Sequence, residues 1–238
     1  MIEIKNVTKK YGDKAVVKDL NLTINDGEIF GFIGPNGAGK STTINMLTGA
    51  LDITEGEILV NNKSIEKEPV EVKKEFGIVP DSPDMFLNFK VLEYFNFIGD
   101  IYEVDSKTRK ERVETLCEKF KITQYLKERI ENLSHGTRQK VIIIGALIHN
   151  PNIWILDEPM TGLDPESSFT LKEMMKEHVS QGKIVFFSSH VLEVVEKLCD
   201  RIGIINNGSL LYVGTLKELK EEYPDKSLED IFLEIIKG

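Results

Sequence analysis

Apolar residues follow two different patterns along the chain. Near the amino terminus they alternate with polar residues, as in Ile2-Glu3-Ile4 and Leu20-Asn21-Leu22-Thr23-Ile24, which is typical of strands with one buried face. Later runs at 153–156, 184–187 and 202–205 are apolar, as expected of strands covered on both faces. Because helical segments alternate with these later strands, the pattern predicts an α/β fold with a mostly parallel sheet and a preceding antiparallel β subdomain.

Between the two groups of strands, the pattern changes at Pro80-Asp81-Ser82-Pro83. Beyond it the apolar spacing becomes helical and predicts helices over 91–102 and 106–120 and a short helix near 123–127. We therefore expect one domain, in which a helical subdomain at 84–132 interrupts a core formed by 1–83 and 133–238. Further strands are expected at 16–17, 29–33, 57–60 and 76–79, with turns at 11–13, 25–27 and 61–62.

The composition is that of an ordinary globular protein, with 41% hydrophobic and 29% charged residues among 238. The net charge of -9 argues against a broad nucleic-acid footprint, which needs clustered Lys and Arg. The longest apolar stretch, 141–148, is far shorter than the roughly 20 residues of a membrane-spanning helix. No secretory signal is evident at the amino terminus, so a cytoplasmic location is expected. Cys117 and Cys199, without a metal-binding spacing, are expected to be small buried hydrophobes.

A glycine-rich loop is the most specific motif. Residues 34–42 read GPNGAGKST and match G-x-x-x-x-G-K-[ST] between an apolar strand and a helix, the context that this phosphate-binding motif requires. The glycines permit positive φ and close backbone approach, so that successive N–H groups converge on phosphate oxygens at a helix amino terminus. Lys40 adds a positive charge, and Ser41 a hydroxyl for a metal ion. We expect a nucleoside triphosphate to bind Gly34, Pro35, Asn36, Gly37, Ala38, Gly39, Lys40, Ser41 and Thr42.

A second candidate site follows the strand at 153–156, which ends in Asp157-Glu158. Ligands of open α/β sheets gather at the carboxyl ends of the strands, and a buried strand ending in an acid is the usual metal-side partner of a phosphate loop. We expect Asp157 to orient magnesium, directly or through water. Glu158 is expected to be the general base that polarises the attacking water.

Three further segments, taken with the loop, make nearly the whole chain resemble the ATP-binding subunit of an ABC transporter. They are Leu133-Ser134-His135-Gly136-Thr137, Thr161-Gly162-Leu163-Asp164 and His190, which closes the strand at 184–189. The first is similar to the family's signature, although His135 and Thr137 replace the commoner Gly and Gln. Ser134 is also a favoured helix N-cap, and Asp164 before Pro165 is a good helix entrance, so both segments have a structural interpretation as well.

The resemblance implies a role for each matching residue. Ser134 and Gly136 would contact the γ-phosphate of ATP held by the opposite subunit, and Asp164 would belong to the loop along the subunit interface. His190 would contact the γ-phosphate and align the attacking water. Tyr11 would stack on adenine, although a tyrosine before Gly12 also fits simple packing. Asp81 stands where the family has a Gln that reaches magnesium and water, so it is either a metal-side residue or a turn residue.

The same resemblance implies an ATP-hydrolysing subunit that powers a membrane transporter through ATP-driven dimerisation, as a homodimer or a heterodimer. It would lie on the inner face of the cell membrane and dock on transmembrane permease subunits, with no nucleic acid expected. The candidate docking residues are Met85, Phe86, Leu87, Phe89, Tyr94, Phe95 and Phe97, of which most would serve as core of the insert.

The segment Ser227 to Leu233 looks most like exporter-type subunits. The alternative is an ABC-type ATPase that acts on the ribosome or DNA without transport. A small-molecule P-loop kinase would leave the signature and His190 unexplained.

Overall fold

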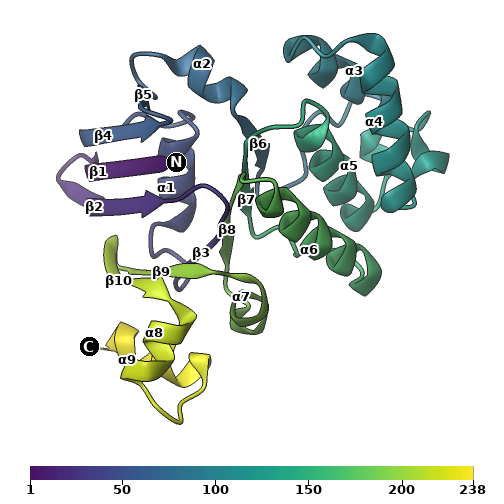
Figure 1. Ribbon diagram of the computed structural model, residues 1–238. Helices are drawn as coiled ribbons and strands as arrows, with labels where there is room; N and C mark the ends of the chain where they lie inside the picture. Colours follow the sequence, from purple (N-terminus) through teal and green to yellow (C-terminus); the bar gives the residue numbers. More distant parts are fainter. Residues whose placement is uncertain (238) are drawn as a thin grey trace.

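The computed structural model describes residues 1–237, and Figure 1 shows its two sheets and the helices around them. The smaller sheet is antiparallel and has the strand order β2-β1-β4-β5. At both of its tight turns, Gly12 and the Asn61-Asn62 pair adopt the positive φ that such hairpins favour. The strands are β1 (Ile2–Tyr11), β2 (Lys14–Ile24), β4 (Glu55–Val60) and β5 (Lys63–Ser64).

The larger sheet has the order β10-β9-β3-β8-β7-β6 and is parallel except for its edge strand β10. The parallel strands therefore present their carboxyl ends at one edge, where α/β proteins bind ligands. This arrangement confirms the predicted fold class. The strands are β3 (Ile29–Ile33), β6 (Phe76–Val79), β7 (Ile153–Asp157), β8 (Ile184–Ser189), β9 (Arg201–Asn206) and β10 (Ser209–Thr215).

Both faces of the parallel sheet are covered, which explains why its strands are apolar without alternation. In β8, Ile184 and Phe186 join the core shared with the antiparallel sheet and α1 (Lys40–Leu47). Val185 and Phe187 join the core on the helical side of the sheet.

The helices lie around the two sheets (Figure 1). Near 123–127, the predicted helix is a single 3-10 turn at Thr123–Tyr125 followed by another at Ile130–Asn132. No helix within residues 1–237 has the length and apolar character needed to cross a membrane. The remaining helices are α2 (Pro69–Lys74), α3 (Val91–Ile101), α4 (Ser106–Lys119), α5 (His135–Leu147), α6 (Pro165–Ser180), α7 (Leu192–Leu198), α8 (Leu216–Glu222) and α9 (Leu228–Lys237).

The two cysteines differ in burial. Cys117 is buried in the helical core, where desolvation raises the pKa of its thiol to about 12. Cys199, the C-cap of α7, is only half-buried, contrary to the prediction. Its sulfur nevertheless packs against β3, since a Cβ added to Gly31 would lie 2.6 Å from it.

Candidate functional site

The glycine loop connects β3 to α1, as predicted, and the helix begins at Lys40. Gly37 and Gly39 have φ of 78° and 112°, values that L-residues with a Cβ rarely adopt. Gly34 is required for a different reason, because a Cβ there would lie 2.3 Å from the backbone oxygen of Ile205 in β9. The loop therefore lies tightly against the sheet and leads directly into the amino terminus of α1. A helix amino terminus favours a bound anion.

The Lys40 side chain is buried within this loop. Its ammonium donates to the carbonyl oxygen of Gly34 at 2.7 Å and to that of Pro35 at 3.3 Å. These contacts satisfy a charge that would otherwise be costly to bury. They also keep the ammonium beside the backbone that would surround a phosphate.

Most of the predicted site residues meet around one cavity of about 440 Å³. They come from the glycine loop, from the segment after β6, and from the ends of β7 and β8, which are the carboxyl ends of neighbouring parallel strands. Two lining residues, Val16 and Thr161, are not among the predicted ones. The cavity is lined by Val16, Asn36, Gly37, Gly39, Lys40, Ser41, Thr42, Asp81, Asp157, Glu158, Thr161 and His190.

The acidic pair lies at the end of β7 and is held from β8. Asp157 is buried, and its Oδ1 accepts a hydrogen bond from the Ser188 hydroxyl. The Glu158 backbone N–H donates to the same Ser188 oxygen at 3.0 Å. Glu158 has φ of 48°, a left-handed conformation that is uncommon for a residue other than Gly and typical of functional sites.

Glu158 also contacts the predicted histidine. One of its carboxylate oxygens, Oε2, lies 2.9 Å from Nδ1 of His190 and accepts the His190 backbone N–H at 3.3 Å. The Glu158 side chain is mostly buried, whereas 61% of the His190 side chain is exposed. The ring and the backbone of His190 thus both contact one oxygen of the carboxylate, and the imidazole stays accessible from the cavity.

The donor set around the cavity suits magnesium. Ser41, Asp81 and Asp157 offer only oxygen atoms, the ligands that a hard cation prefers. No cluster of three or more His, Cys, Asp or Glu with metal-site geometry occurs within residues 1–237. That finding is compatible with magnesium, which usually takes one or two carboxylates and completes its shell with water and phosphate oxygens.

Ser134 and Gly136 do not line this cavity. Ser134 is the N-cap of α5, and its hydroxyl lies 2.8 Å from that of Thr137. Gly136 packs so closely on the loop at 161–164 that an added Cβ would lie 2.4 Å from the Gly162 oxygen. The two predicted interface segments are therefore in contact with each other, and Thr161 connects them to the cavity.

Asp164 and Tyr11 also lie outside the cavity lining. Asp164 caps α6 by accepting from Ser167 N–H at 2.9 Å, and it pairs with Lys140 at 2.7 Å. The hydrogen bond from the Lys140 ammonium is the largest cause that holds the pKa of the Asp164 carboxyl well below its usual range, and the hydrogen bonds from Ser167 contribute less. Tyr11 ends β1 with its ring exposed, and the Lys9 ammonium lies over that ring, 5.2 Å from its centre.

The predicted docking residues separate into two groups. Tyr94 and Phe95 are buried in the helical core, and Phe86, Leu87 and Phe89 pack against it. Met85 and Phe97 are exposed. Met85 and Phe86 also line a cavity of about 450 Å³, together with Ile78 of β6 and His149 after α5.

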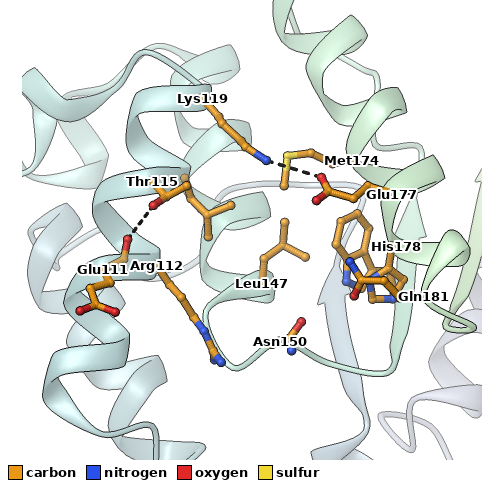
Figure 2. Close-up of a pocket in the computed structure, with 12 residues that line it drawn as sticks. Glu111, Arg112, Thr115, Lys119, Leu147, Asn150, Met174, Glu177, His178 and Gln181 are labelled. Atoms are coloured by element: carbon orange, nitrogen blue, oxygen red, sulfur yellow. Dashed lines mark hydrogen bonds and ion pairs between the residues drawn. The ribbon is translucent and has the colours of Figure 1, made fainter.

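A third cavity, of about 370 Å³, lies between α4 and α6 and contains no predicted residue. Figure 2 shows Lys119 of α4 pointing toward Glu177 of α6 beside it, with 3.6 Å between the charged atoms. His178 of α6 lines the same cavity and stacks on Trp154 of β7, with ring centres 4.2 Å apart. This cavity lies at the junction of the helical segment with the core and is separate from the carboxyl edge of the sheet.

Sequence reasoning missed Val16, Thr161 and Ser188. Thr161 belongs to a segment that was already recognised, and only its place at the cavity was unforeseen. Val16 carries no chemical signal. Ser188 does carry one, because a polar residue near the carboxyl end of an apolar parallel strand lies at the ligand-binding edge of such a sheet.

A glycine loop between a buried strand and a helix, together with a second buried strand of the same parallel sheet that ends in Asp-Glu, defines a P-loop nucleoside triphosphatase. The ABC transporter family matches residues 17–161 of this chain. The linearmycin resistance ATP-binding protein LnrL of Bacillus subtilis (strain 168) is 38% identical over 219 residues, which cover 92% of this chain and 70% of that protein. The chain belongs to the ABC transporter family and is an ATP-binding subunit that hydrolyses ATP.

Solved ATP-binding cassettes share its fold. An ATP-binding subunit of an ABC transporter superposes with a TM-score of 0.94 at 29% identity and covers 99% of both chains. A dimeric ATP-binding cassette, in a post-hydrolysis state bound to ADP and phosphate, has a TM-score of 0.81 at 26% identity and covers 91% of this chain and 99% of its own. These likenesses agree with the mixed sheets and covering helices described above.

Proposed function

We propose that this chain drives a membrane transporter by closing on a second ATP-binding subunit, with ATP held between the two. The observation that carries the proposal is a site in two parts: the glycine loop and the carboxylates line one cavity, whereas Ser134 and Gly136 lie outside it. A second subunit would supply the missing part. The dimeric, ADP-bound cassette with a similar fold supports this arrangement. The partner is a second copy or a related subunit.

Within each half, the residues have distinct proposed roles. Lys40 and the loop N–H groups hold the phosphates, and Tyr11 offers a stacking face for adenine. Glu158 polarises the attacking water, and His190 aligns it beside the γ-phosphate. Asp164 contributes through the interface loop that it caps.

Ser41 and Asp157 would hold magnesium beside these residues, and Asp81 lines the same cavity. The ion would neutralise charge that develops on the phosphate oxygens during hydrolysis. Asp157 orients one carboxylate oxygen toward Ser188, which leaves its other oxygen available for this role.

Permease subunits are the proposed partners, and they would dock at the 450 Å³ cavity near Met85 and Phe86. An exposed methionine beside Ile78 provides an apolar, adaptable contact for another protein. Residues 84–132 would form the helical subdomain that carries this surface, inserted between 1–83 and 133–238. The chain would then lie on the inner face of the membrane, with magnesium and ATP bound from the cytoplasm.

Export is the proposed direction of transport. The support is the likeness to a subunit named for resistance to linearmycin, together with the carboxyl-terminal segment Ser227 to Leu233. No described feature favours the alternative of a ribosome- or DNA-directed ATPase, and the net charge of -9 argues against it.

The test compares Glu158→Gln with Lys40→Ala. Glu158→Gln removes the general base and keeps the shape, so turnover should fall by about 100- to 10,000-fold while ATP affinity is unchanged, and ATP should shift the protein to a dimer. Lys40→Ala removes a charged phosphate contact and should instead weaken ATP binding by about 10- to 100-fold. Steady-state hydrolysis, equilibrium ATP binding and light scattering measure the three quantities.

Glu173→Gln is the matched control, because Glu173 is an exposed α6 residue paired with Lys176. It should resemble the parent protein in all three measurements. Undiminished hydrolysis by Glu158→Gln would overturn the assigned role of Glu158. An ATP-bound Glu158→Gln protein that stays monomeric would overturn a site shared between two copies of this chain.

A further inference from the structure

Ser188 is a fully buried hydroxyl at the carboxyl end of β8, with 0% of its surface exposed. In the parallel ladder it is paired with Asp157 of β7, so the two side chains project from the same side of adjacent strands. A buried polar group destabilises a fold unless it is hydrogen-bonded. The Ser188 hydroxyl both donates and accepts a hydrogen bond, and its two partners are Asp157 and Glu158.

The two hydrogen bonds have different consequences. The Ser188 O–H donates to Oδ1 of Asp157, which selects one orientation of that carboxylate. The same oxygen accepts the N–H of Glu158 at 3.0 Å. A serine hydroxyl can donate and accept at once, so one side chain couples the carboxylate of Asp157 to the backbone of Glu158.

The Glu158 backbone needs such support. Its φ of 48° lies in the left-handed region, which disfavours a residue with a Cβ by about 1–2 kcal/mol. A hydrogen bond at the Glu158 N–H favours this conformation over extended alternatives. The conformation directs the Glu158 side chain to His190, which its Oε2 contacts at 2.9 Å.

We propose that Ser188 is a positioning residue for ATP hydrolysis, which orients Asp157 toward the metal and holds Glu158 in the conformation that faces the attacking water. The inference rests on the roles proposed for Asp157 and Glu158. Ser188 itself is fully buried and does not line the cavity. Its effect on the reaction passes entirely through these two residues.

If Ser188 is a positioning residue, its substitution should change the reaction rate and the magnesium dependence but not ATP binding itself. Ser188→Ala should lower kcat by about 10- to 100-fold, the usual effect of losing a group that orients a metal ligand. ATP affinity measured in EDTA should be unchanged, because the phosphate loop is intact. The magnesium concentration at which ATP raises the melting temperature half-maximally should increase, a readout that needs no turnover.

Threonine and valine provide the decisive pair, because they have nearly the same shape and differ by the hydroxyl. Any cost of the extra branch in the buried site is common to both variants, and both suit a strand. Ser188→Thr should retain most of kcat and the parental magnesium dependence, whereas Ser188→Val should lose at least as much kcat as Ser188→Ala. Equal behaviour of Thr and Val would overturn the proposal, even if Ser188→Ala failed to fold.

The control for burial is Ser64→Ala, since Ser64 is a buried serine of the antiparallel sheet, remote from the acidic pair. Parental kcat is expected for it. Glu158→Gln is measured in parallel: if it is inactive while Ser188→Ala has parental kcat and magnesium dependence, the inference about Ser188 fails alone. Parental activity in Glu158→Gln would instead remove the catalytic role on which the inference rests.

Discussion

At the scale of single residues, the glycines of the phosphate loop are required for two different physical reasons. Gly37 has positive φ with no atom within 4 Å of an added Cβ, so only its backbone conformation opposes a side chain. Gly34 meets a backbone oxygen of β9 instead, and a backbone atom cannot move aside like a flexible side chain. The motif G-x-x-x-x-G-K-[ST] specifies a glycine at position 34 and leaves position 37 open, and the surroundings of the two glycines differ as well.

These surroundings predict unequal effects of alanine. Gly37→Ala should destabilise the protein by about 1–2 kcal/mol through backbone strain. Gly34→Ala should cost more and also weaken ATP binding, because the loop must move away from β9 to admit the methyl group. Urea unfolding and equilibrium ATP binding measure both. A Gly34→Ala protein with parental ATP affinity would show that the loop tolerates this displacement.

At the scale of elements, the contact between α6 and β7 contains a titratable group. His178 stacks on Trp154 and lines the cavity in Figure 2, and burial lowers its pKa from 6.5 to about 4, helped by the charge of Lys183. The histidine is therefore neutral in the folded protein where the unfolded chain already binds a proton. Folding stability must then fall as the pH decreases from about 6.5 to about 4.

The prediction concerns the slope of stability against pH. A lowered pKa in the folded state means that the stability is fully present above the unfolded pKa and is lost below it, at about 1.4 kcal/mol per pH unit for one proton. His178→Phe keeps an aromatic ring on Trp154 and should reduce the slope between pH 6 and pH 4.5. Urea unfolding at several pH values measures it.

His149 contributes a similar slope of stability against pH in the parent protein and in His178→Phe, because burial also lowers the pKa of His149 to about 4. His135→Gln, at an exposed histidine, is the control and should leave the slope as it was. An unchanged slope in His178→Phe would mean that His178 is protonated in the folded protein.

The local sequence predicted whether a segment is a helix or a strand more reliably than it predicted where that segment begins and ends. The Ser134 and Asp164 caps begin α5 and α6 where their side chains predicted. The edge strand β10 was not predicted, although Asn207-Gly208, both with positive φ, is a hairpin signal between β9 and β10. The predicted helix near 123–127 is a 3-10 turn, because its hydrogen bonds run from Tyr125 to Ile122 and from Leu126 to Thr123, each over three residues.

At the scale of the whole molecule, the proposed docking surface lies apart from the nucleotide cavity, so the two can be tested separately. Met85→Asp places a charge at the 450 Å³ cavity and should abolish association with the permease in membranes of the native host. ATP binding by the isolated chain should be unchanged. Sedimentation of the tagged chain with membranes and equilibrium ATP binding test the two statements.

Val70→Asp is the matched control, because Val70 is an exposed apolar residue of α2 that does not line that cavity. It should sediment with membranes like the parent chain. Recovery of Met85→Asp in the membrane fraction at the parental level would place the docking surface elsewhere.

Short-range sequence was sufficient for the phosphate loop, the helix caps and the apolar strands, because their conformations depend on residues within one turn or one strand. Contacts between distant residues depended on the fold. Asp157 meets Ser188 across 31 positions, and the His190 backbone meets Glu158 across 32, through the alignment of two parallel strands. Sheet order and register arise from packing of the whole core, which no local pattern contains. The loop at 34–42 thus identified a triphosphate, and the parallel sheet assembled the residues that would act on it.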